Sequence, residues 1–455
     1  MHLRPYQRDL LEQIQASIAR APTVLVLPTG GGKTVIFCAL AQRYAERSQR
    51  VCILVHRAEL IAQVSATLRT MGVAHGCISP HDEAEPTHVV QVASVQTLVR
   101  RLVQYPPPDL AIVDECHHVT LRTTWGKVLS AWPEAHRLGV TATPHRLSGE
   151  GLSDLFSTMI VGPSVDQLIS IEALSDYQLF APPVTYTDGL HRSMGDYDKH
   201  ELEAAVNTRT ITGNAVAHYS KHAHGKRAIA FCVSVNHARA VAGHFESAGY
   251  PAACLDGSMV PAQRARIICE YIAGRLLILT SCDLANEGVD IPAIEAAILL
   301  RSTQSPTVYL QQVGRALRPS PGKIAIILDH AGNARRHGLP DDEREWSLHG
   351  SKKKNSSASA PIVSLRTCGK CFLAVKSPAT ICPYCGYLFP VAARQVDEVD
   401  GELVRLDTIQ KKIDMKREQS RASTLADLLA IERTRGYAKG WAYHVHQSRT
   451  ARGRW

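Results

Sequence analysis

The stretch LPTGGGKT, residues 27–34, decides the fold, because it joins a short apolar run to a long amphipathic one. The run before it, TVLVLP, has the composition of a buried strand, and the residues after it, KTVIFCALAQRYAER, have that of a helix. Three consecutive glycines let backbone N–H groups crowd around a phosphate. A strand, a glycine turn and a helix that opens on Lys-Thr are the setting of a P-loop. The sequence therefore predicts a phosphate-binding loop at the carboxyl end of a strand.

Two side chains of this loop have separate tasks in binding a nucleotide. Lys33 supplies a positive point charge, and the hydroxyl of Thr34 is a ligand for Mg²⁺. The general motif has glycine where this chain has Leu27, so a merely structural turn is the alternative. The preceding strand and the following Lys-Thr favour the nucleotide site. The residues of the loop predicted to bind the nucleotide are Thr29, Gly30, Gly31, Gly32, Lys33 and Thr34.

Short apolar runs alternate with amphipathic stretches through the first 160 residues, and the pattern starts again after residue 225. Near-continuous apolar strands that alternate with helices indicate a parallel sheet covered on both faces. The more polar stretch 165–225 is predicted to bridge the two halves. Two such α/β units create a cleft, and ligands bind outside the carboxyl ends of their strands.

The sequence DECHH, residues 114–118, follows the apolar run LAIVD and provides a carboxylate pair at the end of a strand. Asp114 is predicted to hold Mg²⁺, and Glu115 to orient or deprotonate the attacking water. An acidic turn that merely ends a strand is the alternative, and the upstream P-loop argues against it. Adjacent His117 and His118 do not converge on one metal ion, so a coupling role is predicted for His117.

These motifs and those that follow, over residues 3–333, resemble the superfamily-2 helicases, within them the RadD-like and phage-encoded DEAD/DEAH-box enzymes. DECH replaces the DEAD or DEAH of the family, with Cys116 at the variable third position. The resemblance implies two RecA-like P-loop domains with parallel sheets. It also implies an ATP- and Mg²⁺-dependent enzyme that acts on nucleic acid.

Four motifs of the first half acquire roles from this resemblance. LRPYQRDLL is similar to the motif that reads adenine, which implies that Gln7 contacts the base. LVHRAELIAQ and SVQTL resemble motifs that hold the nucleic-acid backbone, which implies contacts from Arg57 and Thr97. TATP resembles the segment that couples hydrolysis to domain movement, through Thr141 and Thr143.

Two motifs of the second half complete the set. LTSCDLANEGVDIP is similar to the motif in which Gly288 and Asp290 approach the nucleotide from across the cleft. QQVGRALR fits the pattern Q-x-x-G-R-x-x-R, which implies that Gln311 takes part in coupling and that Arg315 and Arg318 face the γ-phosphate. An arginine finger raises the rate of phosphoryl transfer by about 10³–10⁵. Because these arginines lie in the second half, hydrolysis is expected to require closure of the cleft.

Four cysteines near the carboxyl end form two C-x-x-C pairs separated by ten residues. This pattern predicts a tetrahedral four-thiolate site, for which Zn²⁺ is the default metal. Disulfides and an iron–sulfur cluster are the alternatives. The surrounding residues 351–390 hold six basic and no acidic side chains, so we expect this module to contact nucleic acid. The predicted ligands are Cys368, Cys371, Cys382 and Cys385.

Charge and composition restrict the class of protein further. The formal net charge is +9, and residues 351–455 carry 19 basic and 9 acidic side chains. A neutral body with a basic tail suits a polyanionic partner, and a merely solvated tail is the alternative. No run of 18 apolar residues predicts a membrane span. The first residues lack the apolar core of a signal peptide, so reduced cysteines and a cytoplasmic location are expected.

The last segment includes RGYAKGWAYHVHQSR, residues 435–449, in which aromatic and basic residues alternate. Trp441 and Tyr443 could stack on bases, but packing onto protein is favoured. The tail is also a candidate surface for a protein partner.

The expected function is that of an ATP-dependent DNA helicase or translocase in repair, recombination or replication. The alternatives are an RNA helicase and an ATP-gated clamp that holds nucleic acid without unwinding it. The ordered motifs of the second half nearly exclude a metabolic P-loop kinase. The expected organisation is a first RecA-like domain at 1–165, a bridge at 166–224, a second RecA-like domain at 225–345, a linker at 346–364, a zinc module at 365–390 and a basic helical tail at 391–455.

Overall fold

The computed structural model divides into two compact units, Met1–Pro390 and Val391–Trp455, and each is described by itself. The residues that the structure describes are 2–56, 58–80, 82–83, 85–146, 149–181, 192–193, 196–197, 209–282, 294–350, 365–376, 378–389, 418–419, 422, 424–437 and 439–450.

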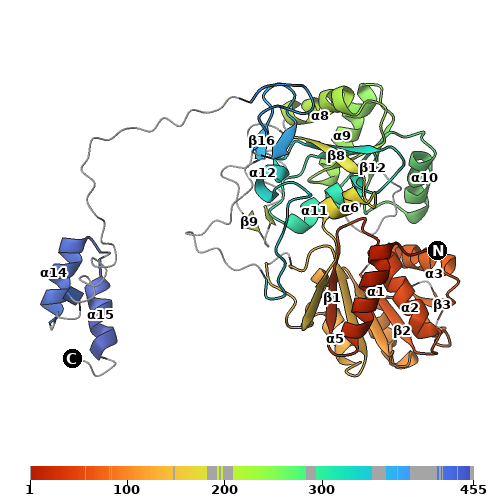
Figure 1. Ribbon diagram of the computed structural model, residues 1–455, viewed down its shortest axis with the longest axis horizontal. Helices are drawn as coiled ribbons and strands as arrows, with labels where there is room; N and C mark the ends of the chain where they lie inside the picture. Colours follow the sequence, from red (N-terminus) through yellow and green to blue (C-terminus); the bar gives the residue numbers. More distant parts are fainter. Residues whose placement is uncertain are drawn as a thin grey trace. The chain divides into compact units, whose positions relative to one another are not determined.

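The first half of the larger unit is a seven-stranded sheet with the order β3-β4-β2-β5-β6-β1-β7 (Figure 1). All of its pairings are parallel, and its five interior strands are buried along their whole length or nearly so. Burial on both faces explains why these strands are apolar without alternation. The strands are β1 (Thr23–Val26), β2 (Val51–Val55), β3 (His75–Ile78), β4 (Val90–Ser94), β5 (Leu110–Asp114), β6 (His136–Thr141) and β7 (Thr158–Val161).

Helices cover both faces of this sheet. On one face, α1, α2 and α3 share a buried cluster that includes Ile14 and Phe37. On the other face, α4 and α5 share a cluster that includes Trp125 and Phe156. The helical elements are α1 (Pro5–Ile18), α2 (Lys33–Ala45), α3 (Ala58–Thr70), α4 (Val95–Arg101), the 3₁₀ turns η1 (Leu102–Gln104) and η2 (Cys116–His118), and α5 (Thr124–Ser130).

The second half is a six-stranded sheet with the order β12-β13-β11-β14-β15-β8, again with parallel pairings only. The predicted fold class, two parallel α/β domains of the RecA type, is therefore confirmed. The strands are β8 (Asp176–Phe180), β11 (Ala228–Phe231), β12 (Ala252–Leu255), β13 (Ile278–Ser281), β14 (Ala296–Leu299) and β15 (Ile324–Asp329). The helices are α6 (Val165–Ser170), α8 (Arg209–His222), α9 (Val235–Ser247), α10 (Pro261–Ile272), α11 (Pro306–Ala316) and α12 (Asn333–His337). A separate two-stranded ladder joins β9 (Arg192–Ser193) and β10 (Asp196–Tyr197).

Strand β8 comes from the stretch 166–224, for which the sequence predicted only a bridge. It pairs with β15 at the edge of the second sheet, and only its last two residues are buried. The first strand of the second half along the chain is therefore the edge strand β8. It precedes the apolar strands that the sequence pattern predicted.

A second crossing between the halves follows α12. Residues 339–350 run back to the first sheet, where the carbonyl oxygen of Leu348 accepts hydrogen bonds from the N–H groups of Leu152 (2.7 Å) and Ser153 (2.9 Å). Trp346 lies edge-on to His145, with ring centroids 5.7 Å apart. Both Trp346 and Leu348 pack against the same cluster as Phe156. We call residues 339–350 the return segment.

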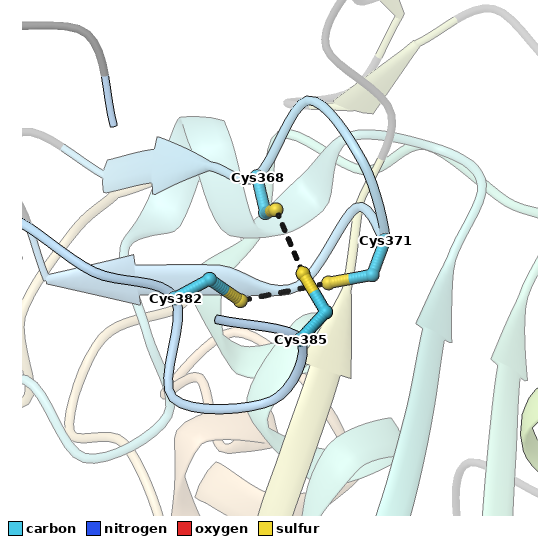
Figure 2. Close-up of side chains that lie close together, drawn as sticks. All are labelled: Cys368, Cys371, Cys382 and Cys385. Carbon is cyan, nitrogen blue, oxygen red and sulfur yellow. Dashed lines mark hydrogen bonds between the residues drawn. The ribbon is translucent and has the colours of Figure 1, made fainter. Parts of the chain in front are cut away.

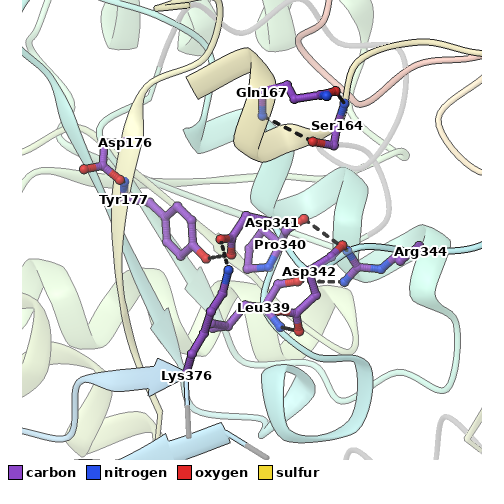
Figure 3. A network of polar contacts seen from close by, with 10 residues as sticks. All are labelled: Ser164, Gln167, Asp176, Tyr177, Leu339, Pro340, Asp341, Asp342, Arg344 and Lys376. Atoms are coloured by element: carbon purple, nitrogen blue, oxygen red, sulfur yellow. Dashed lines mark hydrogen bonds and ion pairs between the residues drawn. The ribbon is translucent and has the colours of Figure 1, made fainter. Parts of the chain in front are cut away.

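The four-cysteine module is built on the antiparallel strands β16 (Leu365–Thr367) and β17 (Ala374–Lys376). It continues the edge of the second sheet, because Phe180 of β8 forms a β-bridge with Leu373. The Lys376 ammonium lies 2.8 Å from the Asp341 carboxylate, which also accepts a hydrogen bond from the Tyr177 hydroxyl (Figure 3). The module is therefore joined to the second sheet by backbone, apolar and ionic contacts.

The smaller unit contains α14 (Leu425–Arg435) and α15 (Trp441–Thr450), as the predicted helical tail requires. Trp441 packs in its apolar cluster and lies 4.5 Å from the ring of Tyr437, whereas Tyr443 is 55% exposed. The carboxylate of Glu432 accepts the N–H of Ala442 and so closes the turn between the helices. Among the described helices, none has the length and apolar composition needed to cross a membrane.

Candidate active site

The P-loop lies between β1 and α2, as the sequence predicts, and two of its glycines are required by backbone conformation. Gly30 and Gly32 have φ angles of +88° and +84°, in the left-handed region that residues with a Cβ atom rarely adopt. A Cβ atom at Gly32 would also lie 2.3 Å from the Nε2 atom of Gln7. Gly32 caps α2, so the loop directs the N–H groups of the first helical turn toward any bound phosphate.

A cavity of about 450 Å³ opens beside this loop and is lined by both halves of the larger unit. The first half contributes P-loop residues and the DECH carboxylates; helix α11 of the second half contributes Gln311 and Arg315, and Arg318 follows the end of that helix. The structure thus brings together, from three separate motifs, the predicted residues Thr29, Gly30, Gly32, Lys33, Thr34, Asp114, Glu115, Gln311, Arg315 and Arg318.

The two DECH carboxylates lie in a setting that favours a bound cation. Asp114 is 7% exposed at the end of β5. Burial raises the pKa of its carboxyl group and the neighbouring Glu115 raises it further, whereas Lys33 opposes the shift. Glu115 has a φ of +48°, a strained conformation for a residue other than glycine. Carboxylate and hydroxyl oxygens at one wall of a phosphate-sized cavity are the donors that Mg²⁺ prefers, so these residues fit the ion.

A chain of hydrogen bonds starts at the buried side chain of His117, next to the DECH carboxylates. Its Nδ1 atom lies 3.3 Å from a carboxylate oxygen of Glu115 and 2.9 Å from the Thr141 hydroxyl oxygen. Because the Thr141 hydroxyl donates its proton to the carbonyl oxygen of Thr143, Thr141 must accept from His117, whose Nδ1 therefore carries hydrogen.

The chain of hydrogen bonds continues into the second half. The hydroxyl oxygens of Thr143 and Thr307 are 2.7 Å apart, and both side chains are buried. Thr307 lies in the first turn of α11, one turn before Gln311, which lines the cavity. No motif in the sequence identifies Thr307. Its position four residues before Gln311 in one helix is the signal that could have found it.

The remaining predicted residues have different surroundings. Gln7 is buried against Gly32, and its Oε1 accepts the N–H of Arg4 at 2.9 Å. Thr97 is only 9% exposed in α4, whereas the adjacent Gln96 is exposed and donates to the carbonyl oxygen of His56 at 3.1 Å. Three predicted residues, Arg57, Gly288 and Asp290, lie outside the described residues.

A larger cavity of about 560 Å³ shares Thr29 with the first one. Its walls are residues 161–167, the side of α11 that includes Val313 and Gly314, and the return segment. Figure 3 shows the polar contacts that shape the return segment here, where Arg344 donates to the carbonyl oxygens of Pro340 and Asp342. This cavity contains neither Lys33 nor Arg315, so the smaller cavity is the one suited to a triphosphate.

The four predicted cysteine ligands converge (Figure 2). The Sγ atoms of Cys368 and Cys385 are 3.6 Å apart, as are those of Cys371 and Cys382, and all four lie within 4.8 Å of one another. A disulfide bond would bring two sulfurs to about 2.05 Å. Tetrahedral coordination with Zn–S bonds of about 2.3 Å places them about 3.8 Å apart. The cluster is therefore compatible with zinc.

A P-loop, a carboxylate pair and arginines from a second parallel sheet, around one cavity, define an ATP-hydrolysing enzyme with two RecA-like domains. Residues 1–146 match the family described as type III restriction enzyme, res subunit, and residues 211–320 match the helicase conserved C-terminal domain. A Lactococcus phage 51.5 kDa protein is 32% identical over 391 residues, which are 85% of this chain and 83% of that protein. The chain belongs to the superfamily-2 helicases and is a nucleic-acid-dependent ATPase.

Two further relatives show the range of the similarity. A Saccharomyces cerevisiae protein named ATP-dependent helicase IRC3 is 28% identical over 341 residues, 70% of this chain and 49% of that one. A solved fragment of an HsdR subunit of a type I restriction enzyme from Vibrio vulnificus YJ016 has a TM-score of 0.60 at 21% identity. The similar region covers 75% of this chain and 67% of that chain. This likeness shows a shared fold. Neither of the two matched family regions includes the four cysteines.

Proposed function

We propose that the chain is an ATP-dependent DNA helicase or translocase that acts in repair, recombination or replication. The observation that carries the proposal is the cavity lined by Lys33 and Glu115 from one sheet and Arg315 from the other. Hydrolysis at such a site depends on the relative position of the two domains. The relatives named for restriction enzymes favour DNA over RNA as the polymer.

The residues of the cavity divide the work of phosphoryl transfer. Lys33 and the amides of the P-loop hold the β- and γ-phosphates, and Glu115 orients the attacking water or accepts its proton. When bound by Thr34 and Asp114, Mg²⁺ would neutralise charge on the phosphate oxygens. Arg315 and Arg318 supply positive charge to the γ-phosphate from the second domain, so the rate depends on closure.

His117, which lies 3.3 Å from the Glu115 carboxylate, begins a chain of hydrogen bonds to α11 that supports a route for coupling. His117, Thr141 and Thr143 link the carboxylate that acts on water to Thr307, and Gln311 extends the same helix into the cavity. A change in the charge near Glu115 therefore reaches the helix that carries the arginines. We propose that this route transmits hydrolysis to movement of the second domain.

The test is ATP hydrolysis by the purified chain with single-stranded, duplex or branched DNA and with RNA, and Lys33→Ala is the blank. Stimulation by DNA alone, followed by strand displacement on a tailed duplex or displacement of a bound roadblock, supports the proposal. Stimulation by RNA alone would make the chain an RNA helicase. Stimulation by DNA without displacement of a strand or a roadblock would make it an ATP-gated clamp.

We also propose that the four cysteines bind a structural Zn²⁺ ion. The Sγ distances and the donation of the Lys370 N–H to the sulfur of Cys368, at 3.4 Å, support this assignment. Four thiolates leave no open coordination position, so the ion would serve the fold. Metal analysis of the purified chain tests the proposal, with one zinc per chain expected and with loss of the metal in Cys385→Ser.

A further inference from the structure

The second hairpin of the four-cysteine module, residues 381–388, exposes four large side chains in a short stretch. We propose that this surface binds single-stranded nucleic acid and stacks on its unpaired bases. The inference rests on the proposed function, because the polymer is the one on which the enzyme acts. We call this set the hairpin surface: Ile381, Tyr384, Tyr387 and Leu388.

The exposure of these side chains is concentrated in one short stretch. Their exposed fractions are 53%, 47%, 37% and 69%, respectively, within eight residues. Ile381 and Leu388 face each other across an antiparallel β-bridge, so they lie on the same face of the hairpin. Single exposed apolar residues are ordinary on protein surfaces, whereas a group of them indicates a binding surface. The hairpin surface therefore leaves a concentrated set of large side chains open to a partner.

Both tyrosine rings are held in place by a buried phenylalanine. Tyr384 lies 5.4 Å from Phe180 at an interplanar angle of 82°, and Tyr387 lies 6.1 Å from Phe389 at 85°. A ring fixed in this way loses little conformational freedom when it stacks on a base. Stacking on tyrosine contributes about 1–3 kcal/mol per base and tolerates any base, as a translocating enzyme requires.

The charge of the sequence that contains the hairpin surface favours a polyanionic partner. Residues 351–390 hold six basic and no acidic side chains. Within the described part of the module, Lys370 is exposed, while Lys376 is paired with Asp341 and Arg366 lies over the ring of Phe389. Among the described basic side chains of the module, Lys370 is thus the one that is available to bind a phosphate. The aromatic rings with a basic surround fit nucleic acid better than a basic or neutral protein.

The attachment of the four-cysteine module to the second sheet would couple a bound nucleic acid to movement of the second domain. The N–H of Ala181, next to β8, donates to the carbonyl oxygen of Phe372 at 3.0 Å. Cys368, Cys371 and Cys382 belong to the same buried cluster as Phe180. A nucleic-acid strand bound to the hairpin surface would therefore move with the second sheet. The arginines that approach ATP belong to the half that is built on this sheet.

The experiment compares full-length variants for binding of a fluorescent oligodeoxythymidine in the absence of nucleotide. Tyr384→Ala/Tyr387→Ala is expected to raise the Kd at least about tenfold, whereas Tyr384→Phe/Tyr387→Phe keeps the rings and the affinity. Val260→Ala/Ile272→Ala removes two side chains of similar exposure from the same domain and serves as the matched control. Metal content shows that each variant retains its module. An unchanged Kd in the alanine variant overturns the proposal.

A second measurement avoids substitution altogether. An oligonucleotide that contains 5-iodouracil is crosslinked to the unmodified chain, and the attached peptide is identified. Attachment within residues 381–389 supports the proposal, and attachment only elsewhere overturns it. The outcome is distinct from that of the proposed function. If the alanine variant loses affinity but no polymer stimulates the ATPase of the unmodified enzyme, the proposed helicase function is refuted and the proposed base contact is not. If a polymer stimulates the ATPase but the alanine variant keeps its affinity, the base contact is refuted and the helicase function is not.

Discussion

Thr307 is the residue through which the two halves share a buried hydrogen bond beside the catalytic wall. Its hydroxyl meets that of Thr143 at 2.7 Å, and nothing in a linear motif requires a threonine there. The sequence predicted His117, Thr141 and Thr143 because they stand within or beside recognisable motifs. It missed their partner because a contact between residues 164 positions apart depends on how the two sheets meet.

We expect Thr307→Val to lower the polymer-stimulated kcat for ATP about fivefold, with the KM for ATP within twofold of the original. The substitution keeps the shape of the side chain but removes a neutral hydrogen bond, for which about 1 kcal/mol is typical. Thr307→Ser restores the hydroxyl and should restore the rate. Steady-state ATPase assays with saturating DNA measure both. A loss in the serine variant with an unchanged rate in the valine variant would mean that Thr307 serves only packing.

His330 makes the stability of the second half depend on pH. Burial lowers the pKa of its imidazole to about 3, with a smaller contribution from the charge of His218. The folded state therefore keeps His330 neutral at pH values at which the unfolded chain, with a pKa near 6.5, is protonated. Its stabilising contribution is present above pH 6.5 and is lost as the pH falls toward 3. We expect the free energy of unfolding to drop by about 2 kcal/mol from this residue between pH 7 and 5.

Chemical denaturation at pH 7 and pH 5 checks this expectation. His330→Gln should reduce the difference between the two pH values, because glutamine does not titrate. His224→Gln, at an exposed histidine of the same half, is the control. A pH dependence that is identical in all three proteins would contradict the assignment.

Among the elements, buried strands were predictable and edge elements were not. The runs LAIVD and AIAFCV are apolar because parallel strands are covered on both faces, so their composition alone revealed them. Strand β8 reads DYQLF, since an edge strand has one side that meets no neighbour in its sheet. The cysteine spacing likewise predicted the ligands of a site. It could not show that three of them would join the apolar core of the second half.

Removal of the metal should therefore destabilise more than the module. Three of the cysteines belong to the same buried cluster as Phe180 and Tyr219. We expect a zinc chelator, or Cys382→Ser, to lower the Tm of the second half by at least about 5 °C, because metal binding supplies folding energy. Calorimetry with parallel metal analysis measures the effect. Cys269→Ser, at an exposed cysteine outside the cluster, is the matched control. A metal-free chain with an unchanged transition would show that the module is only an appendage.

At the scale of the larger unit, the chain joins the two halves twice. The first connection lies between β7 and α6, and the second is the return segment. No sequence pattern indicates the second connection, because Trp346 and Leu348 lie in a short, mixed stretch without periodicity. Their partners on the first sheet are nearly 200 residues earlier in the chain. Such long-range packing is decided by the assembled surfaces and not by local propensity.

The return segment should limit how far the two halves separate. Its far end is fixed by the contacts of Leu348 and Trp346 on the first half. Its near end is fixed by the donation of Arg344 to the carbonyl oxygen of His337 and by the ion pair of Asp341 with Lys376. Trp346→Ala/Leu348→Ala would loosen the far end by removing its apolar contacts while the hydrogen bonds to the Leu348 carbonyl oxygen remain, so that closure around ATP must overcome more conformational freedom. We expect the KM for ATP to rise about three- to tenfold while kcat at saturating ATP and DNA stays within twofold.

Steady-state ATPase assays test this expectation, and distance measurements between dyes on the two halves show whether the open state widens. Val103→Ala, at a fully exposed valine in the 3₁₀ turn η1 of the first half, is the control. An unchanged KM together with an unchanged distance distribution would mean that the first connection alone sets the separation. A fall in kcat without a change in KM would instead place the return segment in the catalytic step, through its contact with His145 beside the TATP motif. The wider open state and the higher KM must appear together, because both follow from the same lost restraint.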